Sequence, residues 1–227
     1  MELRELLENH GMTLQESQLA QLELYADLLI QWNDRFNLTA ITDRQDIYLK
    51  HFADCLLLTG YPLGESLADV GTGAGFPAIV LKIARPQLRI TMLEPNHKKI
   101  SFLSEVIDRL NLENIEAVAQ RSEDYAREHY EQFDTVTSRA VAPLNILSEL
   151  CLPLVRTGGH FLAMKGPRGI EELQESASAL RKLSAEHLAT GSYDLDGQQR
   201  LIIDIVKTAP TNRRYPRNYS QIKKKPL

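Results

Sequence analysis

The sequence contains little cysteine, a single tryptophan and no long apolar run. Its 227 residues include 2 cysteines, Cys55 and Cys151, which lie far apart in the chain. An isolated pair forms neither a disulfide framework nor a zinc site, so we expect no bound metal and place Cys151 in the core. The longest apolar runs, such as residues 56–58 and 201–203, fall far below the roughly 20 residues of a membrane span. The first residues carry no apolar export segment, and we therefore expect a cytoplasmic protein without membrane contact.

Positive charge is scarce in most of the chain and concentrated at one end. The formal net charge is −4, yet residues 208–227 contain six cations and no acid, which leaves −10 for residues 1–207. This asymmetry indicates contact with a polyanion, and nucleic acid is the first candidate. Tyr215 and Tyr219 suit stacking on bases, although a solvated, frayed tail would have the same composition. The cations that we expect to bind RNA are Arg213, Arg214, Arg217, Lys223, Lys224 and Lys225.

Periodicity divides the chain into three parts. An apolar content of 43% is enough for a globular protein with a buried core. Residues 1–60 are predicted to form a helical cap, residues 61–207 an α/β domain and residues 208–227 a basic tail. In the cap, Thr13 and Glu16 have the spacing of a capping box. An apolar stripe follows at intervals of three and four, as on the packing face of a helix, and consists of Leu22, Tyr25, Leu29, Trp32 and Phe36.

Short apolar runs and helical stretches alternate five times in the α/β domain. Such alternation predicts right-handed βαβ units and a doubly wound, mostly parallel sheet. Asp196-Gly197 suits a tight hairpin turn, so the sheet should end with an antiparallel C-terminal strand at or near an edge. The predicted strands are residues 67–70, 88–93, 115–119, 133–137, 160–164 and 201–206. The predicted helices are residues 77–84, 97–110, 122–129, 143–154 and 170–187.

A glycine-rich segment between the first strand and its helix carries the clearest functional signal. Gly71, Gly73 and Gly75 let the backbone turn tightly and approach a ligand without an obstructing Cβ. Glu94 follows the second strand, where a carboxylate can bind both hydroxyls of an adenosine ribose. Asp69 precedes the first glycine and is able to face a cationic ligand group. With the predicted strands, Gly71, Glu94 and residues 120–124 fall at the carboxyl edge of the sheet, where ligands of open α/β folds bind.

Three interpretations of this segment are open: a plain βα turn, a dinucleotide site and a site for S-adenosylmethionine. Gly73-x-Gly75-x-x-Ala78 nominally fits the nicotinamide fingerprint. Asp69 favours the sulfonium cofactor, and Phe76 with Pro77 adds bulk where a pyrophosphate would need open amides. Little chain remains after residue 160 for a domain that carries hydride chemistry. We therefore favour S-adenosylmethionine.

Two cations follow the fourth and fifth strands. Arg139 could hold a cofactor carboxylate or an RNA phosphate, or it could form a salt bridge to Glu123 or Asp134. Lys165 could steer the target nucleotide or be solvated. His51 has no partner pattern for a metal, which indicates a structural or RNA-facing histidine.

Motifs spread over nearly the whole chain resemble the bacterial RsmG family, also called GidB. They are Asp69 to Pro77, Trp32-Asn33, Asn37-Leu38-Thr39, Lys50-His51-Phe52, Ser138-Arg139-Ala140, Lys165-Gly166 and the ending Lys224-Lys225-Pro226-Leu227. The resemblance implies a class I S-adenosylmethionine-dependent methyltransferase with a Rossmann-like fold. It also implies N7-methylation of one guanine, guanine-527, in 16S ribosomal RNA of the small subunit, near the decoding centre. The family pattern would place the cofactor against Gly71, Phe76, Ser122, Glu123 and Arg139.

Methylation at guanine N7 needs no general base, because the atom is an unprotonated lone pair. The sequence has no Asn/Asp-Pro-Pro-aromatic turn after the fourth strand, as exocyclic amine methylation commonly uses, and Cys151-Leu152-Pro153 lacks the Pro-Cys order of pyrimidine-carbon methylation. We expect direct in-line transfer by a monomer, with the glycine-loop rim, Arg139, Lys165 and the tail forming one positive strip for RNA. The alternatives are an NAD(P)-binding oxidoreductase and a non-catalytic RNA-binding assembly factor.

Overall fold

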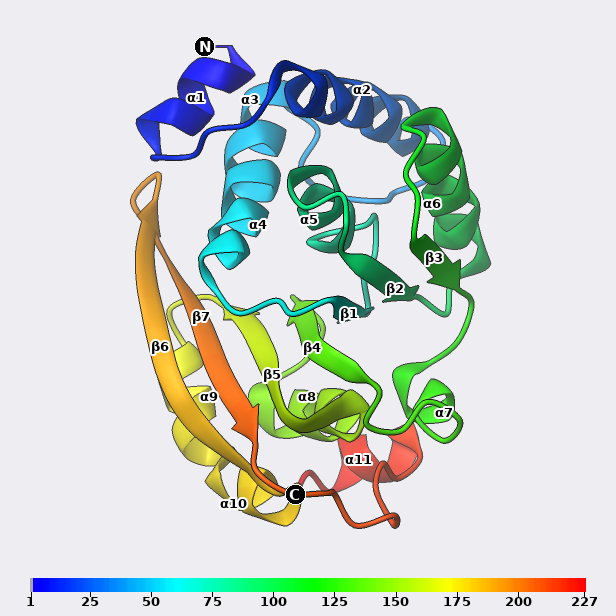
Figure 1. Cartoon of the computed structure of the whole chain (residues 1–227), viewed down its shortest axis with the longest axis vertical. Helices are drawn as coiled ribbons and strands as arrows, with labels where there is room; N and C mark the ends of the chain where they lie inside the picture. Colours follow the sequence, from blue (N-terminus) through cyan, green and yellow to red (C-terminus); the bar gives the residue numbers. More distant parts are fainter. Residues whose placement is uncertain (1) are drawn as a thin grey trace.

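A single seven-stranded sheet runs through the computed structural model, which describes residues 2–227. The strand order is β3-β2-β1-β4-β5-β7-β6 (Figure 1). Strands β1 to β5 are parallel, β7 is antiparallel to β5, and β6 is antiparallel to β7. The strands are β1 (Ser66–Val70), β2 (Arg89–Leu93), β3 (Ile115–Val118), β4 (Phe133–Arg139), β5 (Val155–Lys165), β6 (Ala185–Leu195) and β7 (Gln198–Lys207).

Helices cover both faces of this sheet. In Figure 1, α1 to α6 lie above the sheet and α8 to α11 below it. One apolar cluster joins the first group to one face, and a second cluster joins the other group to the opposite face. The helices are α1 (Leu3–Asn9), α2 (Glu16–Asn33), α3 (Arg44–Ile47), α4 (Asp54–Leu56), α5 (Ala78–Ala84), α6 (His97–Arg109), α7 (Ser122–Tyr125), α8 (Leu144–Cys151), α9 (Gly169–Glu175), α10 (Ala177–Lys182) and α11 (Tyr219–Lys224), with a π-helical turn at Tyr48–Ala53 between α3 and α4.

The predicted fold class is confirmed. Parallel strands β1 to β5 alternate with helices on both faces, and the last strand, β7, is antiparallel. Asp196 and Gly197 both have positive φ, 55° and 70°, as a type I′ hairpin turn requires. The doubly wound sheet brings the carboxyl ends of β1, β2 and β4 to one edge, which positions the candidate site.

Three local predictions are wrong. The capping box lies not at Thr13 but at Gln15 and Gln18, which bond reciprocally at the start of α2. Gln18 also donates to the carbonyl of Ile83 at 2.8 Å, so a tertiary contact helps to set where α2 begins. The helix predicted at residues 122–129 is only the four-residue α7. The helix predicted at residues 170–187 is divided into α9 and α10 and ends at Lys182, because the last predicted residues pair with β7 as the start of β6.

The cap packs into the same core as the sheet. Leu22, Tyr25 and Leu29 of the predicted stripe are fully buried, and Trp32 donates to Glu105 of α6 at 3.0 Å. The division at residue 60 therefore separates elements that share one apolar cluster. Within residues 2–227 no helix has the length and apolar character that a membrane crossing would require.

Candidate active site

The glycine-rich loop joins β1 to α5 and depends on backbone conformations that favour glycine. Gly71, Gly73 and Gly75 have φ of 71°, 63° and 98°. A Cβ on Gly75 would lie 2.4 Å from the Cδ1 atom of Ile79, and one on Gly71 would lie 2.5 Å from Cγ2 of Val141. Bare backbone is therefore needed at both positions, for conformation and for space.

Aromatic side chains from the cap support this loop from beneath. The hydroxyl of Tyr25, in α2, donates to the carbonyl of Ala74 within the loop. The Phe76 ring centroid lies 5.3 Å from that of Tyr25 and 4.2 Å from that of His51, which is stacked on it. The apolar stripe of α2 thus does more than pack, since it also fixes the loop against the cap.

Two buried carboxylates lie against the loop. Glu94, 6% exposed, accepts hydrogen bonds from the Gly73 amide at 3.1 Å and the Asn96 amide at 2.9 Å. Asp69 is fully buried, and its Oδ2 atom accepts from the Thr72 hydroxyl at 2.6 Å and the Ala78 amide at 3.3 Å. Its Oδ1 atom has no hydrogen-bond partner among the residues described. Burial raises the pKa of Asp69 to about 7, as expected for a carboxylate with an unsatisfied oxygen.

Arg139 ends β4 and connects the sheet to the cap. Its Nη1 atom donates to Asp54 Oδ2 at 3.0 Å and to the carbonyl of Lys50 at 3.2 Å, and its Nη2 atom lies 3.0 Å from His51 Nδ1. The guanidinium also lies 5.0 Å from the centre of the Phe76 ring. Burial, followed by the Arg139 charge, lowers the pKa of His51 to about 3, so this histidine is neutral and can accept from Arg139.

Arg139 forms a salt bridge, but with neither of the two predicted partners, Glu123 and Asp134. Asp134 lies at the opposite end of β4, where it binds Arg156 and the backbone of Ser66. Glu123 is buried at the start of α7. The ion pair forms instead with Asp54, 85 positions away in the chain.

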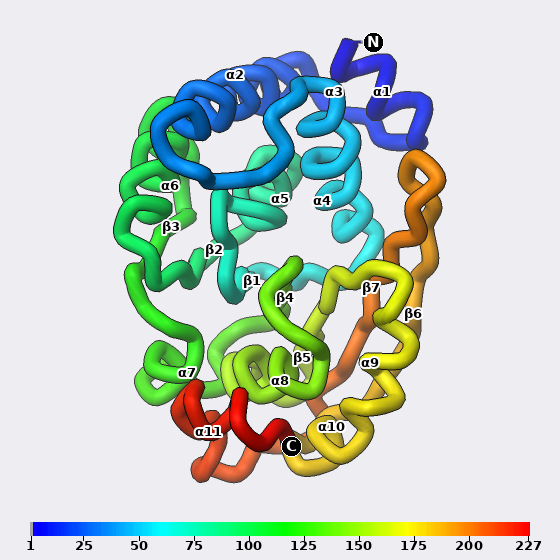
Figure 2. The backbone as a smooth tube through the Cα atoms, turned by 180° about the vertical axis from the view of Figure 1, so that it is seen from behind, coloured from blue at the N-terminus to red at the C-terminus, as the bar shows by residue number. Residues whose placement is uncertain are grey.

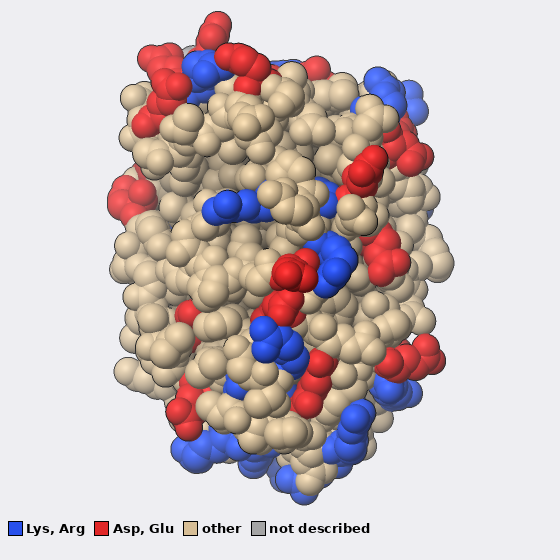
Figure 3. Space-filling model, viewed as in Figure 1, with Lys and Arg blue, Asp and Glu red and all other residues tan. Residues whose placement is uncertain are grey.

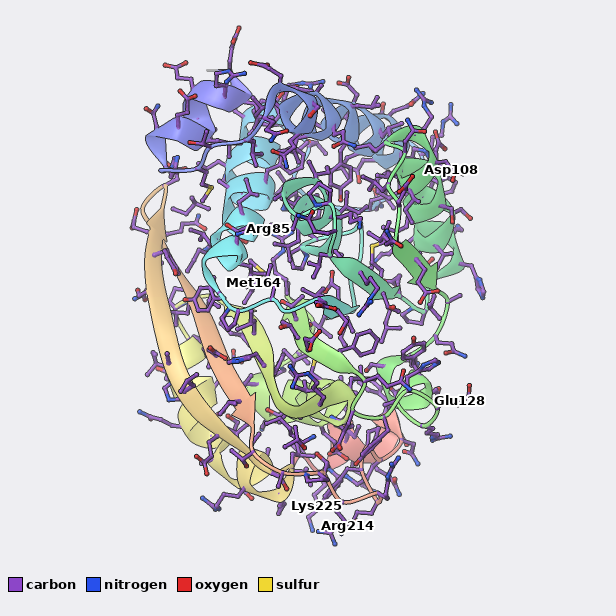
Figure 4. The ribbon with its side chains drawn as sticks, viewed as in Figure 1. Arg85, Asp108, Glu128, Met164, Arg214 and Lys225 are labelled. Atoms are coloured by element: carbon purple, nitrogen blue, oxygen red, sulfur yellow. The ribbon has the colours of Figure 1, made fainter. Side chains whose placement is uncertain are left out.

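A pocket of about 650 Å³ opens beside Arg139. Lys165 lines it but is not solvated: its side chain is 10% exposed, and its Nζ atom donates to the carbonyl of Ala142 at 2.6 Å and pairs with Glu172 at 2.8 Å. Val141 lies between the pocket and Gly71, and Met164 forms part of the wall at the end of β5, near the end of the cap helices (Figure 4). The remaining lining comes from Ile41, Lys50, His51, Asp54, Ala140, Pro143, Gly166, Gln198, Arg200, Leu201 and Ile202.

The other predicted cofactor contacts lie at the same edge of the sheet. Ser122 and Glu123 form the first turn of α7, after β3, and both are buried. Burial raises the pKa of Glu123. The structure therefore brings Arg139 into contact with Phe76 at the end of the glycine loop. It places Ser122 and Glu123 after the carboxyl end of β3, the strand next to β2. Cys151 is fully buried, as predicted for a core residue.

The basic tail is folded onto the domain rather than frayed. It reaches α8 through Arg217, whose guanidinium binds both oxygens of the fully buried Glu149 at 2.6–3.2 Å. The ring of Tyr219 then lies 5.0 Å from the guanidinium of Arg121, directly before α7. Figure 2 shows α11 beside α7 and α8. Cations gather along the lower edge of the molecule in Figure 3, where Figure 4 places Arg214 and Lys225.

Arg217 is therefore expected to act in stability, unlike the exposed lysines of the tail. Replacing Arg217 with alanine would leave Glu149 buried without its cation, and we expect a loss of about 3 kcal/mol in the free energy of unfolding. Chemical denaturation measures this loss. Lys224→Ala, at an exposed position, is the control and should change stability by less than about 0.5 kcal/mol. Equal stability of the two variants would contradict the structural role.

Sequence reasoning missed several residues of this site. Asp54 shares a helix face with His51, but nothing in the chain links it to Arg139. Arg200 and Val141 carry no local motif and reach the site only through the strand order. The π-helical turn at Tyr48–Ala53, a feature frequent at functional sites, was not predictable from an apolar periodicity.

Comparison with known proteins gives consistent results. The family model for rRNA small subunit methyltransferase G, GidB, matches residues 18–202. The chain is 42% identical to ribosomal RNA small subunit methyltransferase G of Staphylococcus carnosus, over 99% of this chain and 97% of that protein, and equally to that of Staphylococcus saprophyticus. Among solved structures, an O-methyltransferase from Bacillus cereus in complex with SAH aligns with a TM-score of 0.59 at 17% identity, covering 90% of this chain and 97% of the other. TYW2 of M. jannaschii in complex with AdoMet aligns with a TM-score of 0.57 at 16% identity, covering 74% and 79%. These two structures share the fold.

Proposed function

This chain belongs to the rRNA small subunit methyltransferase G family, and from that premise we propose that it methylates N7 of one guanine, guanine-527, in 16S ribosomal RNA. The methyl donor is S-adenosylmethionine. The substrate is ribosomal RNA of the small subunit, encountered in the cytoplasm by a monomeric enzyme.

The residues around the glycine loop fit this donor. The observation that carries the proposal is the unpartnered Oδ1 atom of Asp69, a buried carboxylate oxygen beneath a loop of bare backbone. Such an atom suits a cationic ligand, and Glu94 suits an adenosine ribose. Gly71, Phe76 and Arg139 would complete the wall of the crevice, with Ser122 and Glu123 at its far end. When bound, the donor supplies a methyl carbon activated by a sulfonium.

The protein's own contribution is placement rather than proton transfer. Guanine N7 carries a lone pair and releases no proton on methylation, so no base is required. His51 is neutral and already bonded to Arg139 and near Thr39, and Lys165 is paired with Glu172. Arg139 would orient the reacting groups, and Lys165, which holds the carbonyl of Ala142, would fix residues 140–143 beside the base. Such alignment supplies up to roughly 7 to 11 kcal/mol of barrier reduction.

Mapping of ribosomal RNA from cells that lack the protein tests the proposed target. Mass spectrometry or primer extension of the small-subunit RNA should reveal one missing N7-methylguanosine, restored by the wild-type gene. Loss of a methyl group at another atom, such as an exocyclic amine, would contradict the N7 assignment. An unchanged modification pattern would contradict the proposed target altogether.

The exposed lysines of the tail are expected to contribute phosphate contacts. Changing Lys223, Lys224 and Lys225 together to alanine should weaken RNA binding and flatten its dependence on salt, by a slope of up to about 0.7 per lost single-strand contact. Binding titrations between low and moderate salt measure the slope. A variant with Arg181 and Lys182 of α10 changed to alanine is the control, since both are exposed. An unchanged slope in the tail variant would remove the tail from the RNA interface.

A further inference from the structure

We propose that the pocket beside Arg139 binds a phosphodiester of the RNA strand that carries the target base, and that Arg200 is the residue that binds it. This inference rests on the proposed function, because it assigns a substrate contact to the same site. It adds a phosphate contact between the cap and the β6–β7 hairpin to the contacts expected from the tail.

Strand order brings Arg200 to the site. β7 is antiparallel to β5, with Leu201 opposite Lys165 and Ile202 opposite Met164. The first residues of β7 therefore lie beside the last residues of β5, at the carboxyl edge where Arg139 ends β4. Arg200 thus reaches a pocket whose opposite side is made by Lys50 and the rest of the cap.

The charge of the pocket favours an anion. Four of its lining side chains are cations and two are carboxylates, so its balance is +2 in a chain of net charge −4. The cations are Lys50, Arg139, Lys165 and Arg200, and the carboxylates are Asp54 and Glu172. A volume of about 650 Å³ lies within the roughly 300–1,000 Å³ range of ligand pockets and accommodates a nucleotide.

Arg200 is the cation whose charge is least compensated. Lys165 pairs with Glu172 at 2.8 Å, and Lys50 pairs with Asp46 at 2.8 Å. Asp54, 5% exposed, is shared: Arg139 binds its Oδ2 atom at 3.0 Å, while the Nε atom of Arg200 lies 3.6 Å from its Oδ1 atom. Because the single carboxylate of Asp54 is shared by two guanidinium groups, one positive charge is not neutralised.

The hydrogen-bonding capacity of Arg200 points the same way. Its side chain is 24% exposed, and among residues 2–227 its terminal nitrogens donate only to Gln198 Oε1 at 2.8 Å and, at 3.4 Å, to the carbonyl of Gln199. A guanidinium has five N–H donors in a planar fork, which matches two oxygens of a phosphate. Both glutamine contacts come from neighbouring residues in the same strand and leave donors for a ligand.

The apolar part of the pocket completes a nucleotide-shaped site. Val141 is 39% exposed and lies against Gly71, between the pocket and the glycine loop. A base placed against Val141 would lie near the crevice proposed for the methyl donor, with its phosphate directed toward Arg200. The target base must leave its stack to reach this position.

The inference is tested by measuring RNA binding to two variants of Arg200, one that removes its charge and one that keeps the charge but removes the forked guanidinium. Arg200→Gln should weaken the affinity for small-subunit RNA by about 10-fold to 100-fold, the worth of a charge-assisted bond, and lower the salt slope by about 0.7. Arg200→Lys keeps the charge without the fork and should retain the salt slope. Arg156→Gln is the matched control, because it also removes an arginine that pairs with an aspartate, at the opposite end of the sheet.

The readouts separate this inference from the proposed function. RNA affinity is measured without the methyl donor, and binding of S-adenosylhomocysteine is measured by calorimetry on the same proteins. We expect the Arg200 variants to bind S-adenosylhomocysteine as the wild type does. Arg200→Gln with the affinity and salt slope of Arg156→Gln would overturn the inference. Failure of the wild type to bind S-adenosylhomocysteine would overturn the proposed function, while the RNA measurements would still decide the role of Arg200.

Discussion

Arg139→Ala is expected to lower the rate of methyl transfer by about 100-fold to 1,000-fold. Enzymes lose rate in this range when one positioned hydrogen-bond donor is removed or when the reacting groups are slightly misplaced. The substitution removes the contacts to Asp54, Lys50 and His51 and the stacking on Phe76 at the same time. The glycine loop and the cap then lose one of the side chains that join them. Single-turnover kinetics with saturating RNA measures the rate of the chemical step.

Two further variants show whether the guanidinium itself matters. Arg139→Lys keeps the charge but cannot make the same forked contacts, so we expect most of the defect to remain. Arg156→Ala removes an arginine at the start of β5, at the opposite end of the sheet, and should leave the rate within about two-fold. Near-normal transfer by Arg139→Ala in a folded protein would contradict its positioning role. A bell-shaped rate profile that follows an unassigned carboxylate would contradict transfer without a base.

Gly75→Ala is expected to abolish measurable binding of the methyl donor and to destabilise the fold. Its φ of 98° is unfavourable for any L residue, which costs about 1–2 kcal/mol. The new Cβ would also lie 2.4 Å from Ile79 Cδ1 and 2.9 Å from the hydroxyl of Tyr25, and such overpacking costs about 1–3 kcal/mol more. Calorimetric titration with S-adenosylhomocysteine and thermal unfolding measure the two effects.

Gly60→Ala is the matched control for this substitution. No atom of the described residues 2–227 lies within 4 Å of the Cβ position at Gly60, apart from its chain neighbours, and its φ is not in the left-handed region. The control should therefore keep full binding and full stability. Equal behaviour of the two alanine variants would mean that the loop does not depend on bare backbone at Gly75.

The fold class was predictable from the sequence because it follows from local signals. Apolar runs of strand length alternate with helical stretches. Asp196-Gly197 predicts a hairpin turn, and this hairpin makes β7 antiparallel to β6. The glycine loop was predictable for the same reason, since Gly71 to Gly75 are consecutive in the chain. Element ends were less predictable where tertiary contacts decide them, as at Gln18, whose bond to Ile83 fixes the start of α2.

The partners within the site were not predictable, because they come from distant segments. Asp54 and Arg139 are 85 positions apart, and Arg200 comes close to Asp54 only after β7 has paired with β5. The composition of the tail predicted its positive charge but not where it packs on the domain. Arg217 carries the same charge as Arg213, yet the buried carboxylate of Glu149 engages it inside the fold.

A crystal structure of the protein soaked with S-adenosylhomocysteine tests the central claim most directly. We predict density for the adenosyl group in the crevice at the carboxyl ends of β1 and β2, with its ribose at Glu94 and its amino acid portion near Asp69 and Arg139. Parallel soaks with NADP should leave that crevice empty. Density for NADP alone, or no density in either soak, would contradict the account.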